Sequence, residues 1–349
     1  MIMLCLLAMA SCEKEIEIKK SGRECELSVN AALLAGVPDQ AVYIAKSFHD
    51  RVRGIKEAHL DCYVNDELMA SSDSLVPASA YPGYNYDGVM KIPFRVSFDS
   101  GDNVRIEVTG DGLATYAENV APRPAKITSV DTIPMLKISN GKKHTVTKLK
   151  IKLRDVPNIR NYYRIELFVR YSITQIYLAP DEYDSVGLQF LRKGILNISV
   201  DNRAEPILYT GNHFGANPNY DQDDVDYYEN KYNLFTDKEF ENGEYEMTLL
   251  SRDFRQIYDF LGIAFLPTVR VSEKRTLVVR LYTMDKDMYS YYNNMMYDNS
   301  WQGREDYVPS IPYPENVHGG NGFVGALGVS DYEIELPYIE DLYKHHHSN

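Results

Sequence analysis

Alternation of apolar and polar residues dominates the first third of the chain. A period of two predicts strands that bury one face. Candidate strands of this kind cover 25–34, 41–48, a segment through Cys62, 92–98 and 104–108. The last two flank a Gly-containing loop at 99–102, and this arrangement predicts a hairpin. Several short strands without a long helical period predict an immunoglobulin-like β-sandwich over residues 25–122.

The alternation returns after Ala121-Pro122-Arg123-Pro124. Two prolines flanking one residue favour an extended, semi-rigid backbone, so this segment is the predicted domain boundary. Beyond it, Leu149, Ile151 and Leu153 alternate with lysines, which indicates a half-buried strand. Further strands are predicted around 165–171, 245–249 and 277–281. The prediction is therefore a larger β-sandwich or open-barrel domain over residues 126–340, followed by a tail at 341–349.

Two stretches have helical spacing, so the mainly β chain is predicted to contain one or two short helices. Apolar residues from Phe254 to Leu261 recur at helical intervals after Ser251, a candidate N-cap. The stretch from Asp285 to Met296 places methionines and tyrosines on one face. That stripe is favoured as core packing against the sheet, with a ligand groove as the alternative.

The first twelve residues form an uncharged apolar run that ends at Ala10-Ser11-Cys12. The run is shorter than the ~20 apolar residues of a membrane-spanning helix. Its small residues before a cysteine resemble a bacterial lipobox, which makes 1–11 a signal peptide, Cys12 the lipidation site and 12–24 a lipidated tether. A buried N-terminal strand is the alternative, and the charged run that follows at once disfavours it.

Glu13 and Glu15 refine the predicted location. Acidic residues this close to the lipidated cysteine resemble the signal that sends Bacteroidota lipoproteins to the outer face of the outer membrane. The expected localisation is therefore the outer membrane, with the protein lipid-anchored through Cys12 and displayed on the cell surface. The lipid bilayer is thus the first expected partner.

Composition limits the remaining partners. The chain has 349 residues, 44% hydrophobic and 25% charged, as expected of packed globular domains. A net charge of −13 argues against binding to nucleic acid, which requires a cationic face. Tyrosine is abundant, with 28 residues against a single Trp, and most of these are expected to be structural.

Two of the four cysteines, Cys25 and Cys62, fall in the predicted first domain. An even pair in an exported chain is a candidate disulfide. Two free buried thiols are an equally good alternative, because free cysteine is commonly buried.

A set of aromatic and glycine positions in the last two thirds of the chain resembles a known family. The residues are Asn161-Tyr162-Tyr163, Phe235-Thr236-Asp237, Phe240, Gly243, Tyr245, Tyr289, Tyr292 and the glycine-rich segment 314–326. Together they resemble an uncharacterised family of Bacteroidota lipoproteins, domain of unknown function 4249, from Cys12 to about Leu336. Members look like envelope proteins often encoded beside TonB-dependent transporters, which implies nutrient uptake or surface binding. The family has no established catalytic residues to carry over.

The glycine-rich segment and one acidic cluster are the candidate sites. Gly319, Gly320, Gly322 and Phe323 lack the Lys-Ser/Thr and the strand-to-helix context of a phosphate loop. A structural role, in which glycine lets the backbone pass close to another chain, is favoured over an exposed binding loop. The residues Asp221, Asp223, Asp224 and Asp226 are a weak calcium candidate without the EF-hand pattern. No other metal and no cofactor are predicted.

No catalytic motif is evident, because the histidines are scattered and no nucleophile elbow is present. The first hypothesis is a non-enzymatic binding or accessory protein for a TonB-dependent nutrient transporter. Its ligand would be an unidentified small molecule, glycan or peptide. The alternatives are an adhesive or structural surface protein and a hydrolase of surface polymers.

Overall fold

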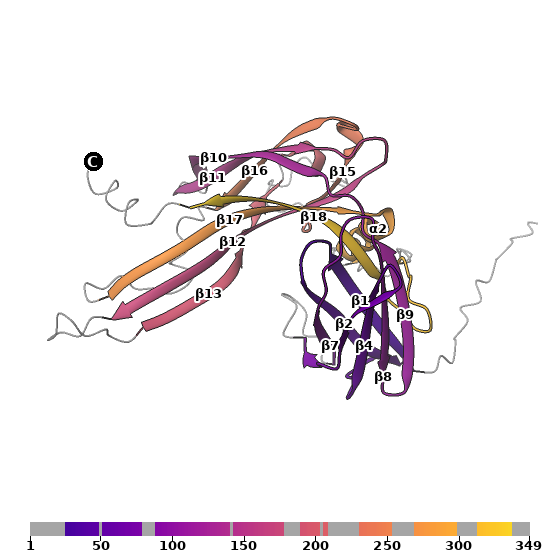
Figure 1. Ribbon diagram of the computed structural model, residues 1–349. Helices are drawn as coiled ribbons and strands as arrows, with labels where there is room; N and C mark the ends of the chain where they lie inside the picture. Colours follow the sequence, from indigo (N-terminus) through magenta and orange to yellow (C-terminus); the bar gives the residue numbers. More distant parts are fainter. Residues whose placement is uncertain are drawn as a thin grey trace, which may run out of the picture.

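The computed structural model describes residues 25–48, 51–78, 88–139, 142–177, 189–202, 205–208, 230–252, 269–298 and 313–336. Within these ranges the chain is mainly β and forms two β-sandwiches (Figure 1). The predicted fold class is therefore confirmed. No helix in this part of the chain has the length and apolar character needed to cross a bilayer.

The first sandwich packs two sheets around one apolar core. One sheet is part of a ten-stranded sheet that continues into the second sandwich, and this part contains β1 (Glu26–Leu34), β2 (Asp39–Phe48), β3 (Arg51–Arg53), β6 (Val76–Pro77) and β7 (Met90–Arg95). The other contains β4 (Ala58–Val64), β5 (Glu67–Ser72), β8 (Asn103–Gly110) and β9 (Leu113–Val120). Burial alternates along β1, β4 and β8, so each contributes every second side chain to the core between the sheets.

The second sandwich has longer strands. Its first sheet contains β10 (Lys126–Ser139), β11 (Lys142–Arg154), β14 (Val200–Asp201) and β16 (Glu244–Arg252). The facing sheet is the other part of the ten-stranded sheet and contains β12 (Tyr162–Tyr177), β13 (Gln189–Asn197), β15 (Leu234–Thr236), β17 (Val269–Met284) and β18 (Val324–Glu335). This part of the chain also contains two 3₁₀ turns, η1 (Pro206–Leu208) and η2 (Asp237–Glu239). The lysine-flanked strand behaves as predicted, because Leu149, Ile151 and Leu153 are buried in the core between these sheets.

Strand β18 belongs to both sandwiches. Its first residues, up to Leu327, pair in parallel with β1, and from Gly328 onwards it pairs antiparallel with β17. The proline segment, residues 121–124, passes close to β18 at the residue where β18 changes partner. A Cβ on Gly328 would lie 2.4 Å from the carbonyl oxygen of Pro122, so only glycine leaves room for this approach. The backbone N–H of Ala125 then donates to Thr283 Oγ1 at 2.9 Å. The predicted boundary thus marks where β9 ends and β10 begins, but the chain returns to the first sandwich near its other end.

The glycine-rich segment closes one side of the first sandwich. His318 exchanges backbone hydrogen bonds with Tyr116 of β9, at 2.8 and 3.1 Å. Three residues later, Asn321 exchanges backbone bonds with β1, donating to Leu27 and accepting from Val29, both at 2.9 Å. A Cβ on Gly320 or Gly322 would lie only 2.4 or 2.2 Å from a β1 carbonyl oxygen. These glycines therefore let the segment run against β1 and join the two sheets.

The predicted hairpin between 92–98 and 104–108 is wrong. Strand β7 pairs with β2 and β6, whereas β8 pairs with β4 and β9 in the opposite sheet. Phe94, Val96 and Phe98 are all buried, because the chain crosses from one sheet to the other while still lining the shared core. Alternation reports burial of one face but does not report which sheet a strand joins.

Helix α2 (Lys286–Asp298) is confirmed near its predicted bounds. Asp285 caps it: its Oδ1 accepts the backbone N–H of Met288 at 2.7 Å, three residues into the turn. Met288, Tyr292 and Met296 are buried against β12, β17 and the start of β18, so the stripe packs in a core as favoured. The other predicted helix, over 254–261, lies outside the described residues.

Cys25 and Cys62 are both free thiols. Cys62 is in the first core on β4, whereas Cys25 precedes β1 of the facing sheet and is half-buried. Burial raises the pKa of the Cys62 thiol to about 12, so the reactive thiolate is strongly disfavoured at neutral pH. The structure therefore corresponds to the second alternative, two unpaired cysteines.

This arrangement predicts unequal labelling of the two thiols. Brief treatment of native protein with iodoacetamide at pH 8 should modify Cys25 and spare Cys62, and unfolding in guanidinium should make both reactive. Peptide mass spectrometry measures the two sites separately. Protection of both thiols until a reductant is added would show that they are bonded instead.

Asp111, in the turn between β8 and β9, ties the two sheets of the first sandwich together. Its carboxylate is bonded by Lys46 Nζ of β2 and accepts backbone N–H groups of Lys56 and Glu57 at 3.1 and 3.2 Å. These donors lower the pKa of Asp111, with Lys46 contributing most. A lowered folded-state pKa stabilises the fold above the unfolded pKa, ~3.9, and this contribution is lost as pH falls through the folded value.

Replacing Asp111 by Asn should therefore have a pH-dependent effect. Asparagine tolerates the φ of +48° at this position, so the substitution removes the charge without backbone strain. The variant should melt below the native protein at neutral pH, and the gap should narrow as pH falls below ~4. Thermal denaturation from pH 3 to pH 8 measures it. A gap that stays constant across this range would exclude the ion pair as its cause.

Candidate binding groove

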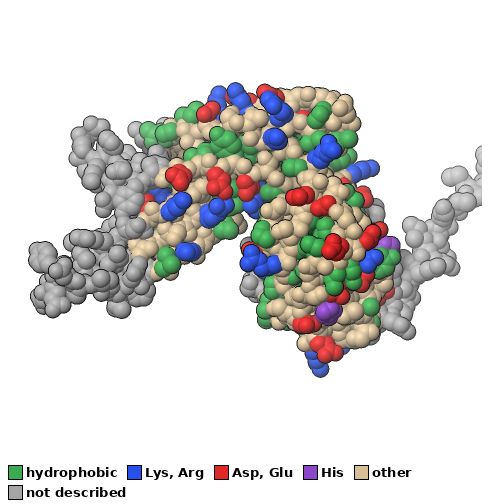
Figure 2. Space-filling view, in the orientation of Figure 1, with side chains coloured by type: hydrophobic (Ala, Val, Ile, Leu, Met, Phe, Trp, Pro, Cys, Tyr) green, Lys and Arg blue, Asp and Glu red, His purple; other side chains and the backbone are tan. Residues whose placement is uncertain are grey.

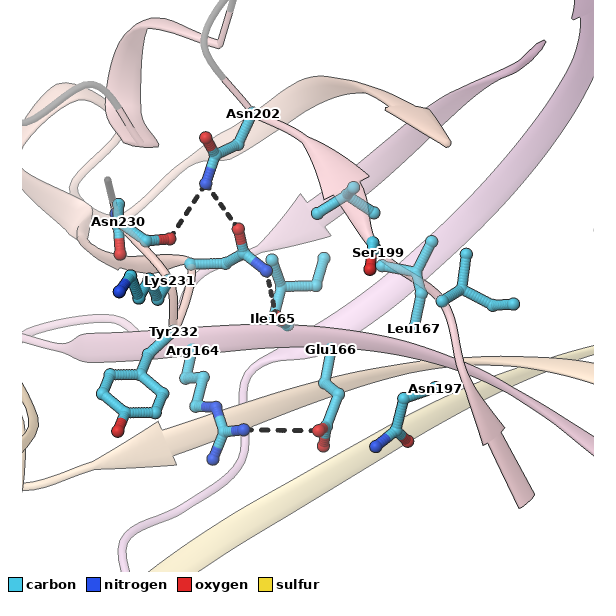
Figure 3. Close-up of a pocket in the computed structure, with 13 residues that line it drawn as sticks. Arg164, Ile165, Glu166, Leu167, Asn197, Ser199, Asn202, Asn230, Lys231 and Tyr232 are labelled. Carbon is cyan, nitrogen blue, oxygen red and sulfur yellow. Dashed lines mark hydrogen bonds and ion pairs between the residues drawn. The ribbon is translucent and has the colours of Figure 1, made fainter. Parts of the chain in front are cut away.

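One interruption in the second sandwich lies along an edge of β12. Strand β15 pairs with residues 162–164 of β12, and β13 pairs with residues 168–176. Between them, at residues 165–167, no strand continues the sheet among the described residues. A cavity of about 280 Å³ occupies this gap, lined by residues 164–167, 197–200, Asn202 and 230–233. This cavity is called the β12 groove below (Figure 3).

Asparagine side chains replace the missing strand. Asn233 has a φ of +50°, a left-handed conformation that asparagine tolerates. In this conformation its backbone carbonyl oxygen accepts a hydrogen bond from the backbone N–H of Ile165, with an N–O distance of 3.2 Å. Its side-chain amide donates to the carbonyl of Ile165, also at 3.2 Å. Asn202 then donates to Asn233 Oδ1 at 2.6 Å and to the Asn230 carbonyl at 3.0 Å. One wall of the groove is therefore a fixed network of amides (Figure 3).

The opposite wall carries charge and aromatic rings. Arg164 donates to Glu166 Oε1 at 3.3 Å, and both project from the outer face of β12 beside Asn197 and Tyr232 (Figure 3). The guanidinium lies 5.2–5.6 Å from the centroids of three tyrosine rings, an arrangement that favours cation–π attraction. These rings belong to Tyr232, Tyr282 and Tyr292.

The carboxylate of Glu166 is held from two sides. Tyr282 donates its hydroxyl to Glu166 Oε2 at 2.6 Å. Burial and the charge of Glu166 raise the pKa of Tyr282, so this phenol stays protonated and remains a donor. Arg164 supplies the second bond, and Glu166 is therefore a positioned hydrogen-bonding group.

The sheet face beyond the groove is a ladder of ion pairs. Arg280 forms a two-bond contact with Asp331, each at 2.7 Å, and Arg170 pairs with Glu333 at 3.1 Å. Acidic and basic side chains are interspersed on the part of the molecule formed by these strands (Figure 2). Because the charges neutralise one another locally, this face presents no field of a single sign.

A second polar cluster lies at the end of the same sandwich and is structural. Asp155 accepts from Tyr163 Oη, from the Asn161 side chain at 3.0 Å and from the Asn242 backbone at 2.8 Å. Asn161 also donates its backbone N–H to Asp237 at 2.6 Å. The rings of Phe235, Phe240 and Tyr245 pack beside Tyr163 and one another. Most of the aromatic and polar positions that carried the family resemblance therefore meet here, in the core.

The sites predicted from the sequence lie in different parts of the chain, and two of them are not among the described residues. Cys12 and the acidic cluster at Asp221, Asp223, Asp224 and Asp226 lie outside the described residues. The proposed binding loop runs between β1 and β9, where residues 318–323 form what is called the glycine-rich seam below. Phe323 is buried there, and the glycines allow the close approach of the backbone to β1. Across the described ranges, no group of three or more His, Cys, Asp or Glu residues is placed to hold a metal ion.

The groove was not predicted. Arg164 and Glu166 look like ordinary solvent-facing positions of an alternating strand, and the gap beside them depends on which strands pair. The available signal was the recurrence of asparagine in two short segments, 197–202 and 230–233. Asparagine in such a segment favours turns, so it could have indicated a break between strands.

Two solved structures are distantly similar to this chain. The adhesin InvE of Yersinia pseudotuberculosis matches at 12% identity and a TM-score of 0.19, covering 74% of this chain and 55% of the adhesin. A structure named BspA_C_WT matches at 9% identity and a TM-score of 0.16, covering 88% of this chain and 99% of that one. No curated protein matches the chain.

The comparison with family models is specific. The model described as a domain of unknown function, DUF4249, matches residues 13–333. This range includes both sandwiches, the β12 groove and the glycine-rich seam. The chain therefore belongs to the DUF4249 family.

Proposed function

We propose that this protein is a surface-exposed outer-membrane lipoprotein that acts as a non-enzymatic binding or accessory protein for a TonB-dependent nutrient transporter. Its location rests on the lipobox-like Ala10-Ser11-Cys12 and on the acidic residues that follow. Acylation of Cys12 would hold the two sandwiches at the membrane by a polar tether.

The observation that carries the binding role is the β12 groove. Its polar groups are held in place by one another, as expected of a site that is formed before its ligand arrives. Glu166 is the single carboxylate among the described lining residues, and Arg164 and Tyr282 already bond it. General acid–base hydrolysis of glycans requires two carboxylates at the reacting bond. The groove therefore suits binding better than hydrolysis.

A deletion strain tests the accessory role. Removing the gene should reduce the mass of a TonB-dependent transporter complex on native gels and slow growth on the substrate of that transporter. The native gene should restore both, whereas a Cys12→Ser version, which lacks the acylation site, should restore neither. Unchanged complexes and unchanged growth across a substrate panel would contradict the proposal.

A further inference from the structure

We infer that the β12 groove binds an uncharged polyhydroxylated ligand, that is, a neutral glycan. This inference rests on the proposed binding function and specifies the chemical class of its ligand. It follows from two observations: which backbone and charged groups of the groove are already bonded to one another, and which hydrogen-bonding side chains line the cavity.

An extended peptide does not fit the edge of β12. Peptides that add to a sheet need exposed backbone N–H and C=O groups on an edge strand. Here both backbone groups of Ile165 are bonded to Asn233, and the carbonyl of Leu167 accepts from Ile198 at 2.9 Å. The backbone positions that strand addition would use are therefore occupied.

An ionic ligand does not match the charges. The guanidinium of Arg164 is paired with Glu166, and Glu166 also accepts from Tyr282. The two charges therefore compensate one another inside the groove, and neither presents an uncompensated charge to an incoming ion. Lys231 adds one exposed cation at the rim, where water and salt screen it.

Hydroxyl groups fit what remains. The exposed amide of Asn197 can both donate and accept. Asn202, whose amide hydrogens are already donated, and Glu166 add acceptor oxygens, and a hydroxyl both donates and accepts. The ring of Tyr232 lies beside Arg164, at the other end of the groove from Asn197 (Figure 3), and adds apolar surface of the kind that suits the C–H face of a sugar ring. The cavity volume, about 280 Å³, lies just below the usual range for ligand pockets, which begins at ~300 Å³. A terminal sugar of a larger glycan would match this size.

The test is a binding titration with the full-length, detergent-solubilised protein. Neutral glucan, mannan and xylan oligosaccharides serve as probes, with polygalacturonate and an unstructured peptide as the charged and peptide comparisons. Asn197→Leu keeps the size of an exposed side chain but removes its hydrogen bonds, and should weaken binding of the neutral glycan about tenfold. Lys193→Leu, on the same strand outside the groove, is the matched control and should change the affinity by less than about twofold.

Two results would overturn the inference. One is the absence of binding to every neutral glycan, or a preference for the charged glycan or the peptide. The other is neutral-glycan binding that Asn197→Leu leaves intact, which would place the ligand elsewhere. The titration needs no transporter, so its failure with an intact transporter complex would reject the ligand class and leave the accessory role standing.

Discussion

Truncation of the chain after Pro314 is expected to unfold both sandwiches. The deletion removes β18 together with Phe323, Val324 and Leu327, which are buried against β1, β17 and α2. Each large apolar side chain contributes about 1.5–3 kcal/mol when buried, and total domain stability is only about 5–15 kcal/mol. The first sandwich would also lose the seam that joins β9 to β1.

Hydrogen–deuterium exchange with peptide resolution measures this effect in each sandwich separately. Truncation after Leu336 is the matched control, because it removes none of the described residues, and it should preserve protection throughout. If the shorter chain kept β1 and β4 protected at the level of the native protein, the first sandwich would be independent of β18, as the sequence-based domain division implies.

Substitution of Gly322 by Ala should be the most damaging single change in the seam. The residue has a φ of +113°, and an added Cβ would lie 2.2 Å from the carbonyl oxygen of Val29. Backbone strain and a forced shift of β1 together should reduce the free energy of unfolding by about 3 kcal/mol or more. Urea denaturation followed by circular dichroism measures the loss.

Gly112 provides the control for this prediction. It also has a positive φ, +81°, but nothing lies within 4 Å of an added Cβ. Gly112→Ala should therefore reduce the free energy of unfolding only through backbone strain, by about 1 kcal/mol. Equal losses for the two variants would show that close packing against β1 contributes nothing to the need for glycine at Gly322.

Local patterns predicted individual elements well. The alternation around Leu149 and the helical stripe of Met288, Tyr292 and Met296 correspond to a strand and a helix that bury those residues. Both patterns record burial of one face, which is decided within a few residues of chain. The mainly β class and the presence of two β-sandwiches followed from the same signal.

Long-range pairing could not be predicted in this way. The parallel contact between Ala31 and Val324 joins opposite ends of the chain, and neither segment carries a local mark of its partner. The hairpin error at 92–108 has the same origin, since a crossing between sheets and a turn within one sheet give equal alternation. The β12 groove exists only because two strands pair with different parts of β12, so its residues look ordinary in the sequence.

The most direct test of the central claim, that this protein acts as a binding partner of an outer-membrane transporter, is a quantitative co-purification. The protein, expressed from its native gene, would be recovered from detergent-solubilised outer membranes and its partners identified by mass spectrometry. The account predicts a TonB-dependent transporter in stoichiometric amount. Recovery of this protein alone, under detergents that preserve other transporter complexes, would contradict the account and favour a free-standing adhesive protein.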